Sequence, residues 1–347
     1  MPISIVVGGQ FGSEGKGKVA LEIVRRSHGP VTVIRVGGPN SGHTAYDRDG
    51  KKWALRQMPA ACIDRNVDVV FPAGSYLDTE ILLREINELD YPLDRIYISK
   101  YASLITPEQI AWEEASGLVG SIGSTGSGVG AALLASAARG AKNFPLEALH
   151  AGNDARLEKF RRDTTALLHK KLLAEERVVI EGTQGFGLSL LDGGHWPKAT
   201  ARCTTAAAAL AEAGLSPLLV DNVTMVLRAF PIRVAGDSGP LPGETSWARI
   251  AQRSGLERDI REYTTVTKKE RRVGEFDASS VRRAIRANTP NRIVLNHLDY
   301  VGPAASVSNP NSAVSKFIRM VSSEIMQRID WYGFSELGVL EANGVLA

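Results

Sequence analysis

The chain has 347 residues, 44% of them hydrophobic, and a formal net charge at pH 7 of only +3. This composition supplies a sizeable core and lacks the strong positive charge of a nucleic-acid-binding protein, so we expect phosphorylated small molecules as partners. Cys62 and Cys203 lie far apart, which argues against a disulfide framework or a zinc site and favours a reducing cytoplasm. With no secretory leader and no apolar run of roughly 18 residues, we expect neither secretion nor membrane insertion.

Short β-branched segments alternate with helical patterns along the chain. Such segments are typical of strands that are buried on both faces of a parallel sheet. The alternation predicts one α/β domain over residues 1–347, with a largely parallel central sheet, flanking helices and long ligand-binding loops. The expected strands are Ile3–Val7, Val31–Val36, Val67–Phe71, Ile96–Ser99, Val178–Ile180, Val223–Phe230 and Ile293–Leu295, and the expected helices are Lys18–Arg26, Thr79–Leu89, Leu157–Leu173 and Thr204–Ala213.

The first strand leads into the turn G-G-Q-F-G-S-E-G-K-G-K at residues 8–18. Glycines let backbone N–H groups approach phosphate oxygens, the following helix adds its positive end, and lysines supply countercharge. The turn fits neither the Walker pattern, because Gln10 stands at the first glycine position, nor the dinucleotide pattern. A tight connection without a ligand is the alternative, but the two lysines favour a phosphate site.

The second loop, G-G-P-N-S-G-H-T at residues 37–44, follows the second expected strand. His43 is flanked by glycine and hydroxyl residues, so an exposed role as proton donor or oxyanion stabiliser competes with a purely structural one. Asn40 has the amide to bind a phosphate or a purine edge. The Gly42 carbonyl offers an oxygen ligand to Mg²⁺.

Two later segments have the composition of nucleotide-binding loops. G-S-T-G-S-G-V-G at residues 123–130 is either a flexible linker or a monophosphate site that Arg139 completes with a bidentate contact. E-G-T-Q-G at residues 181–185 directly follows an expected strand, and the Gln184 amide can both donate to and accept from a purine edge.

Two further loops carry hydroxyl and basic residues. T-A-R-C-T-T at residues 200–205 reads as a helix cap and an anion site at Thr200. T-T-V-T-K-K-E-R-R-V-G at residues 264–274 is either a solvated charged surface or a site where hydroxyls and paired arginines bind a dicarboxylate.

Together, these loops resemble the adenylosuccinate synthetase family. G-S-E-G-K-G-K at residues 12–18 is similar to the family's G-D-E-G-K-G-K, residues 37–44 to its G-G-x-N-A-G-H-T, and residues 181–185 to its E-G-A-Q-G. The likeness extends through residues 123–130, Arg233 and Val234, the loop that ends at Gly274, and Leu298 and Asp299. It covers roughly residues 3–300, whereas the last forty-odd residues fit poorly.

The resemblance implies a homodimeric, Mg²⁺-dependent ligase whose partners are small-molecule substrates. In this family, a nucleoside triphosphate phosphorylates the purine 6-oxygen, and the aspartate amine then displaces phosphate. The resemblance assigns catalysis to Ser13, His43 and Gln184, and Mg²⁺ contact to Ser13 and Gly42. It assigns triphosphate binding to Ser13, Gly15, Lys16, Gly17, Lys18, Gly42, His43, Thr44, Asn296 and Asp299, and aspartate binding to Thr265, Thr267, Arg271 and Arg272. The residues that it assigns to purine-nucleotide binding are Ser13, Asn40, Ser124, Thr125, Arg139 from the other subunit, Gln184, Thr200 and Val234.

Ser13 stands where the family has the catalytic aspartate that takes the purine N1 proton. A serine cannot replace that base at neutral pH, but it is small and uncharged and can accept a hydrogen bond from the 2-amino group of guanine. In this respect the chain resembles the phage-type branch, which makes N6-succino-2-amino-2′-deoxyadenylate from dGMP and aspartate for diaminopurine nucleotide synthesis. If it is phage-encoded, the chain is expected in the host cytoplasm.

A second departure concerns the phosphoryl donor. The family's guanine-reading T-K-L-D segment is replaced by Asn296, His297, Leu298 and Asp299, and its C-terminal S-x-G-P is missing. These changes favour ATP or dATP over GTP, although Asp299 is retained. The alternatives are a conventional adenylosuccinate synthetase that uses IMP and GTP, a catalytically inactive nucleotide-binding paralogue, and a generic NTPase that the failed Walker pattern disfavours.

Overall fold

The computed structural model describes residues 2–64, 66–255, 260–264 and 269–342. Its main sheet has ten strands within these residues, and every neighbouring pair is parallel except the last, which is antiparallel. In spatial order the strands are β10 (Arg161–Arg162), β7 (Ile96–Ser99), β5 (Asp68–Phe71), β2 (Val31–Arg35), β11 (Arg177–Glu181), β1 (Ile3–Gly8), β12 (Val220–Arg228), β16 (Arg292–Asn296), β17 (Trp331–Tyr332) and β18 (Leu340–Glu341).

The seven strands expected from the sequence are all present, and the α/β prediction is confirmed. The expected helix Leu157–Leu173 is interrupted after Phe160, where a 3-10 helix (Ala155–Phe160) ends. Arg161 and Arg162 pair with β7 as the edge strand β10, and α6 (Thr164–Leu173) starts only after Asp163, whose side chain accepts a hydrogen bond from the Ala166 N–H. An aspartate in extended conformation is a strong N-cap and so breaks the helical pattern.

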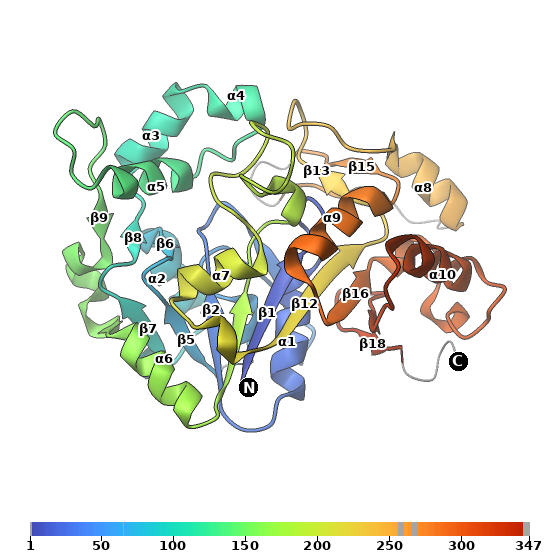
Figure 1. The fold of residues 1–347 in the computed structure, drawn as a ribbon, viewed down its shortest axis with the longest axis horizontal. Coiled ribbons are helices and arrows are strands. Elements are labelled where there is room, and N and C mark those ends of the chain that lie inside the picture. Colours follow the sequence, from blue (N-terminus) through green and yellow to red (C-terminus); the bar gives the residue numbers. More distant parts are fainter. Residues whose placement is uncertain (1, 65, 256–259, 265–268, 343–347) are drawn as a thin grey trace.

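Helices cover both faces of the sheet, because alternate residues along each strand face opposite cores. Val6 of β1 packs into the core beneath α1 (Lys16–Arg26) and α2 (Thr79–Glu88). Ile5 and Val7 pack into the opposite core, which is closed by α6, α7 (Ala206–Ala213), α9 (Ala278–Asn288) and α10 (Ala313–Ile325), as Figure 1 shows for α7 and α9. No helix in the described part of the chain has the length and apolar character to cross a membrane.

Smaller elements surround the carboxyl ends of the central strands (Figure 1). On one side are α3 (Pro107–Ala115), α4 (Leu118–Ile122) and α5 (Val129–Ala138), with the sheet of β6 (Tyr76–Leu77), β8 (Ser103–Leu104) and β9 (Leu149–His150). On the other are β13 (Ile232–Arg233), β14 (Glu244–Thr245), β15 (Arg272–Gly274) and α8 (Trp247–Ser254), around their own apolar cluster. That the chain forms a single domain stays a prediction.

Candidate active site

The loop between β1 and α1 is held in shape by a carboxylate that sequence analysis did not single out. Glu14 is fully buried, and its Oε1 accepts hydrogen bonds from the backbone N–H groups of Gly12 at 2.8 Å and Gln10 at 3.2 Å. Its Oε2 lies 2.7 Å from the Lys16 ammonium. Buried polar groups of this kind need partners, and these partners are all in one loop. This loop, residues 9–15, is called the phosphate loop after its predicted ligand. Its shape is therefore fixed by contacts within the protein, and the Lys16 charge is paired.

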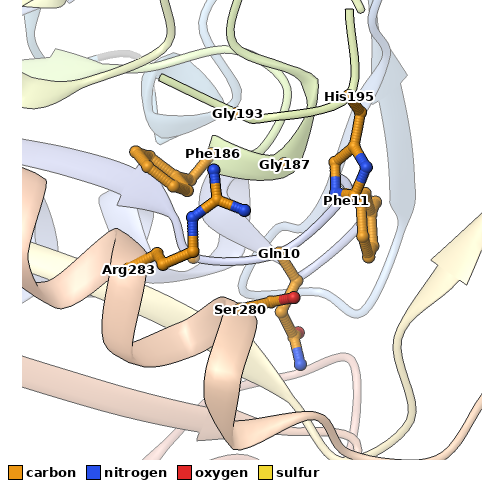
Figure 2. A pocket seen from close by; sticks show the side chains of 9 residues that line it. Gln10, Phe11, Phe186, Gly187, Gly193, His195, Ser280 and Arg283 are labelled. Atoms are coloured by element: carbon orange, nitrogen blue, oxygen red, sulfur yellow. The ribbon is translucent and has the colours of Figure 1, made fainter. Parts of the chain in front are cut away.

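Phe11 of the same loop lies beside the His195 ring (Figure 2). Its ring lies 5.4 Å from the His195 ring, centroid to centroid, and the Arg233 guanidinium stacks 4.7 Å from its centroid. The adjoining cavity, between this loop, residues 186–195 and α9, holds only about 10 Å³. That is about the space that one water molecule needs, so the cavity is too small to hold a substrate.

A buried carboxylate organises the next strand end. Glu181, the last residue of β11, is 0% exposed and accepts hydrogen bonds at Oε1 from His43 Nδ1 at 2.5 Å and Arg35 Nη1 at 3.1 Å. The backbone N–H groups of Ala60 and Ala61 also donate to it, at 3.1 and 3.2 Å. Burial alone would raise the pKa of Glu181, but His43 and Arg35 bring it down to about 2.

The expectation of an exposed His43 is wrong. His43 opens β3 (His43–Tyr46), which pairs with β4 (Lys52–Leu55), and its side chain is only 7% exposed because the ring turns inward onto Glu181. Burial, and then the charge of Arg35, lowers the pKa of His43 to about 4. The ring therefore donates from Nδ1 to the carboxylate and keeps Nε2 for a ligand, and a phosphate bound there would favour the protonated ring.

Close packing joins the loops that follow β1, β2 and β11. A Cβ added at Gly17 would lie 3.0 Å from the His43 Cβ and 3.5 Å from the Thr44 carbonyl oxygen. A Cβ added at Gly12 would lie 4.0 Å from the Gln184 Cα. The predicted phosphate, histidine and glutamine segments thus meet at one end of the sheet.

A chain of hydrogen bonds orients Gln184. The Arg202 guanidinium pairs with Glu212 and donates from Nη2 to Thr183 Oγ1 at 2.8 Å, and the Thr183 hydroxyl donates to Gln184 Oε1 at 3.3 Å. Because a guanidinium only donates, the direction of the chain is fixed, and it leaves the Gln184 amide N–H₂ for a ligand. Arg202 was not among the predicted site residues.

The end of β16 closes the other side of the phosphate loop. Asn296 Nδ2 donates to the Glu14 carbonyl oxygen at 2.7 Å, and Lys18 Nζ donates to the Ser335 carbonyl oxygen at 2.8 Å. Burial lowers the pKa of Lys18 to about 8, against the opposing charge of Asp299. The structure therefore brings together the triphosphate residues predicted from sequence, namely Ser13, Gly15, Lys16, Gly17, Lys18, Gly42, His43, Thr44, Asn296 and Asp299.

The residues predicted to bind the purine nucleotide come from several loops that pack together. A Cβ added at Gly130 would lie 3.3 Å from the Ala201 Cβ, next to Thr200, and one added at Gly123 would lie 3.5 Å from Val234. Loop 123–130 therefore lies against both the Thr200 and the Val234 segments, and it carries Ser124 and Thr125.

Two of the predicted nucleotide ligands differ in their surroundings. Asn40 is half-buried, and its Oδ1 is a buried atom with no hydrogen-bond partner in the part of the chain that the structure describes. Arg139 is exposed at the C-terminal end of α5. The contribution of Arg139 to a second subunit stays a prediction.

The two arginines of the predicted aspartate loop face different partners. Arg271 Nη1 donates to the Ser13 hydroxyl at 2.5 Å, which places this arginine at the phosphate loop. Arg272 instead forms a bidentate pair with Glu244, at 2.6 and 2.5 Å. The other two predicted aspartate ligands, Thr265 and Thr267, lie outside the described residues.

A buried ion-pair network lies beneath the Ser13 and Arg271 pair. Arg228 at the end of β12 is fully buried, donates from Nη1 to the Ser13 carbonyl oxygen at 3.1 Å and pairs with Glu262. Burial alone would raise the pKa of Glu262, but the charge of Arg228 and its hydrogen bonds bring it down to about 2. Neither Arg228 nor Glu262 was predicted, because neither belongs to a recognisable motif.

The chain is similar to known proteins of one family. Residues 5–145 and 145–308 match the profile of the adenylosuccinate synthetase family. The adenylosuccinate synthetase of Pyrococcus sp. (strain ST700) is 36% identical over 303 residues, covering 86% of this chain and 84% of the relative. That of Methanococcus vannielii is 33% identical over 337 residues, covering 95% of both chains.

Two solved structures share the fold. Cyanophage S-2L succinoaminodeoxyadenylate synthetase (PurZ), bound to dGMP and to dATP as an energy donor, superimposes with a TM-score of 0.80 at 28% identity, covering 98% of this chain and 95% of the phage protein. Fully ligated adenylosuccinate synthetase from Plasmodium falciparum gives 0.82 at 19% identity, covering 98% and 100%, which shows the fold alone. The chain therefore belongs to the adenylosuccinate synthetase family of carbon–nitrogen ligases.

Proposed function

We propose that this protein condenses dGMP with L-aspartate to give N6-succino-2-amino-2′-deoxyadenylate, using ATP or dATP as the phosphoryl donor. The observation that carries this proposal is an uncharged hydroxyl, that of Ser13, at the centre of the site and held there by Arg271. The likeness to the cyanophage structure with dGMP and dATP supports it.

The hydrogen-bonding capacity of Ser13 suits a guanine edge. Arg271 can only donate, so Ser13 Oγ accepts that bond and keeps one lone pair and its own proton. The free lone pair can accept from the 2-amino group, and the smaller side chain leaves that group more space than an aspartate would. A purine without a 2-amino group gains nothing from this acceptor.

The described side chains support phosphoryl transfer followed by amine displacement. We infer that the loop around Lys16 and the ammonium of Lys18 hold the triphosphate, while His43 Nε2 meets the transferring phosphoryl group and the 6-oxygen. The Gln184 amide donates to the purine 6-oxygen. Arg271 holds an aspartate carboxylate, so that its amine reaches C6 as phosphate leaves.

Mg²⁺ is the cofactor that the family implies, and the residues present fit it in part. Asn40 Oδ1 and Ser41 Oγ, beside Gly42, are buried oxygens without a hydrogen-bond partner in the described part of the chain, and oxygen donors are what Mg²⁺ prefers. The described residues contain no cluster of three acidic, histidine or cysteine ligands. We therefore propose that the Gly42 carbonyl and Ser13 contact an ion held mainly by nucleotide phosphates, and that this ion offsets charge on the transferring group.

For the donor, the proposal of ATP or dATP rests on the segment after β16. Asn296 uses its Nδ2 on the Glu14 carbonyl, and burial and the charge of Arg228 lower the pKa of His297 to about 3, so that the ring is neutral. A neutral imidazole here differs from the lysine that the family carries in its guanine-reading segment. In the proposed dimer, Arg139 of each subunit reaches the nucleotide phosphate in the other.

A conventional reaction of IMP, aspartate and GTP is the second candidate. It is favoured by the sequence relatives, since adenylosuccinate synthetases of archaea reach 37% identity whereas the phage structure reaches 28%. The two candidates differ in the group at purine position 2 and in the donor, so one experiment separates them.

That experiment crosses substrates. The purified protein is incubated with Mg²⁺ and aspartate, with dGMP, GMP or IMP as acceptor and ATP, dATP or GTP as donor, and the products are weighed by mass spectrometry. A succinyl adduct of dGMP supports the proposal. An adduct formed from IMP alone overturns it, and ligand binding without any product indicates an inactive paralogue.

Ser13→Asp tests the selecting residue. The carboxylate fills the space beside the purine edge and pairs with Arg271, so kcat/KM for dGMP relative to IMP should fall by roughly 100-fold. Steady-state kinetics with both acceptors measure the ratio, and Ser13→Ala serves as the matched uncharged control. An unchanged ratio in Ser13→Asp would remove Ser13 from the explanation.

A further inference from the structure

The position of Arg271 depends on a carboxylate outside every motif noted in the sequence. Glu262 Oε2 lies 3.5 Å from Arg271 Nη1 and 3.2 Å from Arg228 Nη1. Its Oε1 accepts from Arg228 Nη2 and, at 3.0 Å, from the Tyr300 hydroxyl. One carboxylate is therefore shared by two guanidinium groups and a phenol, each from a different segment of the chain.

Both arginines in turn contact Ser13. Arg228 Nη1 reaches its carbonyl oxygen at 3.1 Å, and Arg271 Nη1 reaches its hydroxyl at 2.5 Å. Further support comes from Trp247, whose indole N–H donates to the Arg271 carbonyl oxygen at 2.8 Å and whose ring packs edge-on against Tyr300. The phosphate loop and the aspartate loop are thus joined through a single acidic group.

The charges in this network do not cancel. Two guanidinium groups face one carboxylate, while His297 and Tyr300, which pack beside them, are neutral because burial lowers the pKa of the first and raises that of the second. One positive charge remains beside Ser13. Since the Arg228 side chain is fully buried, the group free to meet a substrate carboxylate is Arg271.

We propose that Glu262 is a positioning residue for the second step, in which the aspartate amine displaces phosphate. Glu262 holds the Arg271 guanidinium at Ser13, so that aspartate is bound with its amine directed at the purine. This inference rests on the proposed role of Arg271 in aspartate binding. Glu262 itself touches no substrate, and its effect reaches the reaction through Arg271. A guanidinium displaced by about 1 Å would lose a charge-assisted hydrogen bond to the substrate carboxylate, and such a bond is worth about 100-fold in the binding of aspartate.

The test is a set of variants whose kinetics are measured with whichever purine nucleotide the wild type condenses. Glu262→Gln should raise KM for aspartate about 100-fold with little change in KM for the nucleotide. Glu262→Asp, which keeps the charge, should recover part of the loss. The matched control is Glu270→Gln, an exposed carboxylate eight positions further along the chain, whose ion pair among the described residues is a long one, at 3.9 Å, to Arg261. It should leave both KM values unchanged.

A double variant separates positioning from folding. Glu262→Gln leaves the buried Arg228 charge without its carboxylate, so Arg228→Met with Glu262→Gln removes both charges. If aspartate KM stays high in the folded double variant, Glu262 acts on Arg271. If it returns to the wild-type value, or if Glu262→Gln raises both KM values equally, the positioning role is overturned. A wild type that condenses only IMP would refute the dGMP proposal while leaving this test intact.

Discussion

Two carboxylates organise the two ends of the site in different ways. Glu181, at the end proposed to bind phosphate (the phosphate end), is completely enclosed and bound by two side chains and two backbone N–H groups. Glu262, at the end proposed to bind aspartate (the aspartate end), has an 18% exposed side chain, and its carboxylate is bound by side chains alone among the described residues. Glu181 is itself a residue of the central sheet, whereas Glu262 links Arg271 of the predicted aspartate loop to Arg228 of the sheet. We infer that the phosphate end is rigid before ligands bind, whereas the aspartate end depends on ion pairs.

Neutralising each carboxylate should expose this difference most strongly. Glu181→Gln leaves the fully buried Arg35 without its countercharge, so the free energy of unfolding should fall by about 3–5 kcal/mol. Glu262→Gln should cost less, roughly 2 kcal/mol, because water reaches that site. Urea unfolding of the two variants and the wild type measures both values. Equal losses of stability in the two variants would contradict the distinction between the enclosed Glu181 and the partly exposed Glu262.

Acid should weaken the phosphate end first. The pKa of His43 is lowered from 6.5 to about 4, so the unfolded chain takes up this proton at a higher pH than the folded protein. Stability is therefore lost as pH falls from 6.5 towards 4, by roughly 3 kcal/mol from this group.

The aspartate end should respond only at lower pH. With a pKa lowered from 4.5 to about 2, Glu262 contributes stability that is present above pH 4.5 and lost as pH falls towards 2. Above pH 4.5, the urea midpoint should change less with pH in His43→Asn than in the wild type, and should change with pH as in the wild type in Glu262→Gln, although the midpoints of that variant are lower. A His43→Asn profile identical in shape to that of the wild type would contradict the assignment.

The smallest expected effect concerns the link between β16 and the phosphate loop. Asn296→Ala removes the hydrogen bond to the Glu14 carbonyl, which should lower the free energy of unfolding by about 1 kcal/mol. If the link also shapes the donor site, KM for the triphosphate should rise while KM for aspartate stays constant. A rise in KM for aspartate alone would contradict a role of Asn296 in the donor site.

The sequence by itself determined the sheet and predicted the edge at which the candidate ligand-binding loops gather. The seven apolar segments could be read as strands because each is buried on both faces, and the glycine-rich and polar loops directly follow several of them. Carboxyl ends of parallel strands share one edge, so these loops had to converge. The family motifs predict which residues of each loop face the ligands, and that assignment stays a prediction.

Only the tertiary structure decided which charged groups pair. His43 looked exposed from its glycine-rich neighbours, yet it is buried against Glu181, 138 positions away in the sequence. Glu262 belongs to no motif noted in the sequence, yet it meets Arg228, 34 positions away. Local sequence encodes backbone preference and the face that is buried, whereas an ion pair depends on which loops the topology brings together. The partners of a buried charge therefore cannot be read from its own segment.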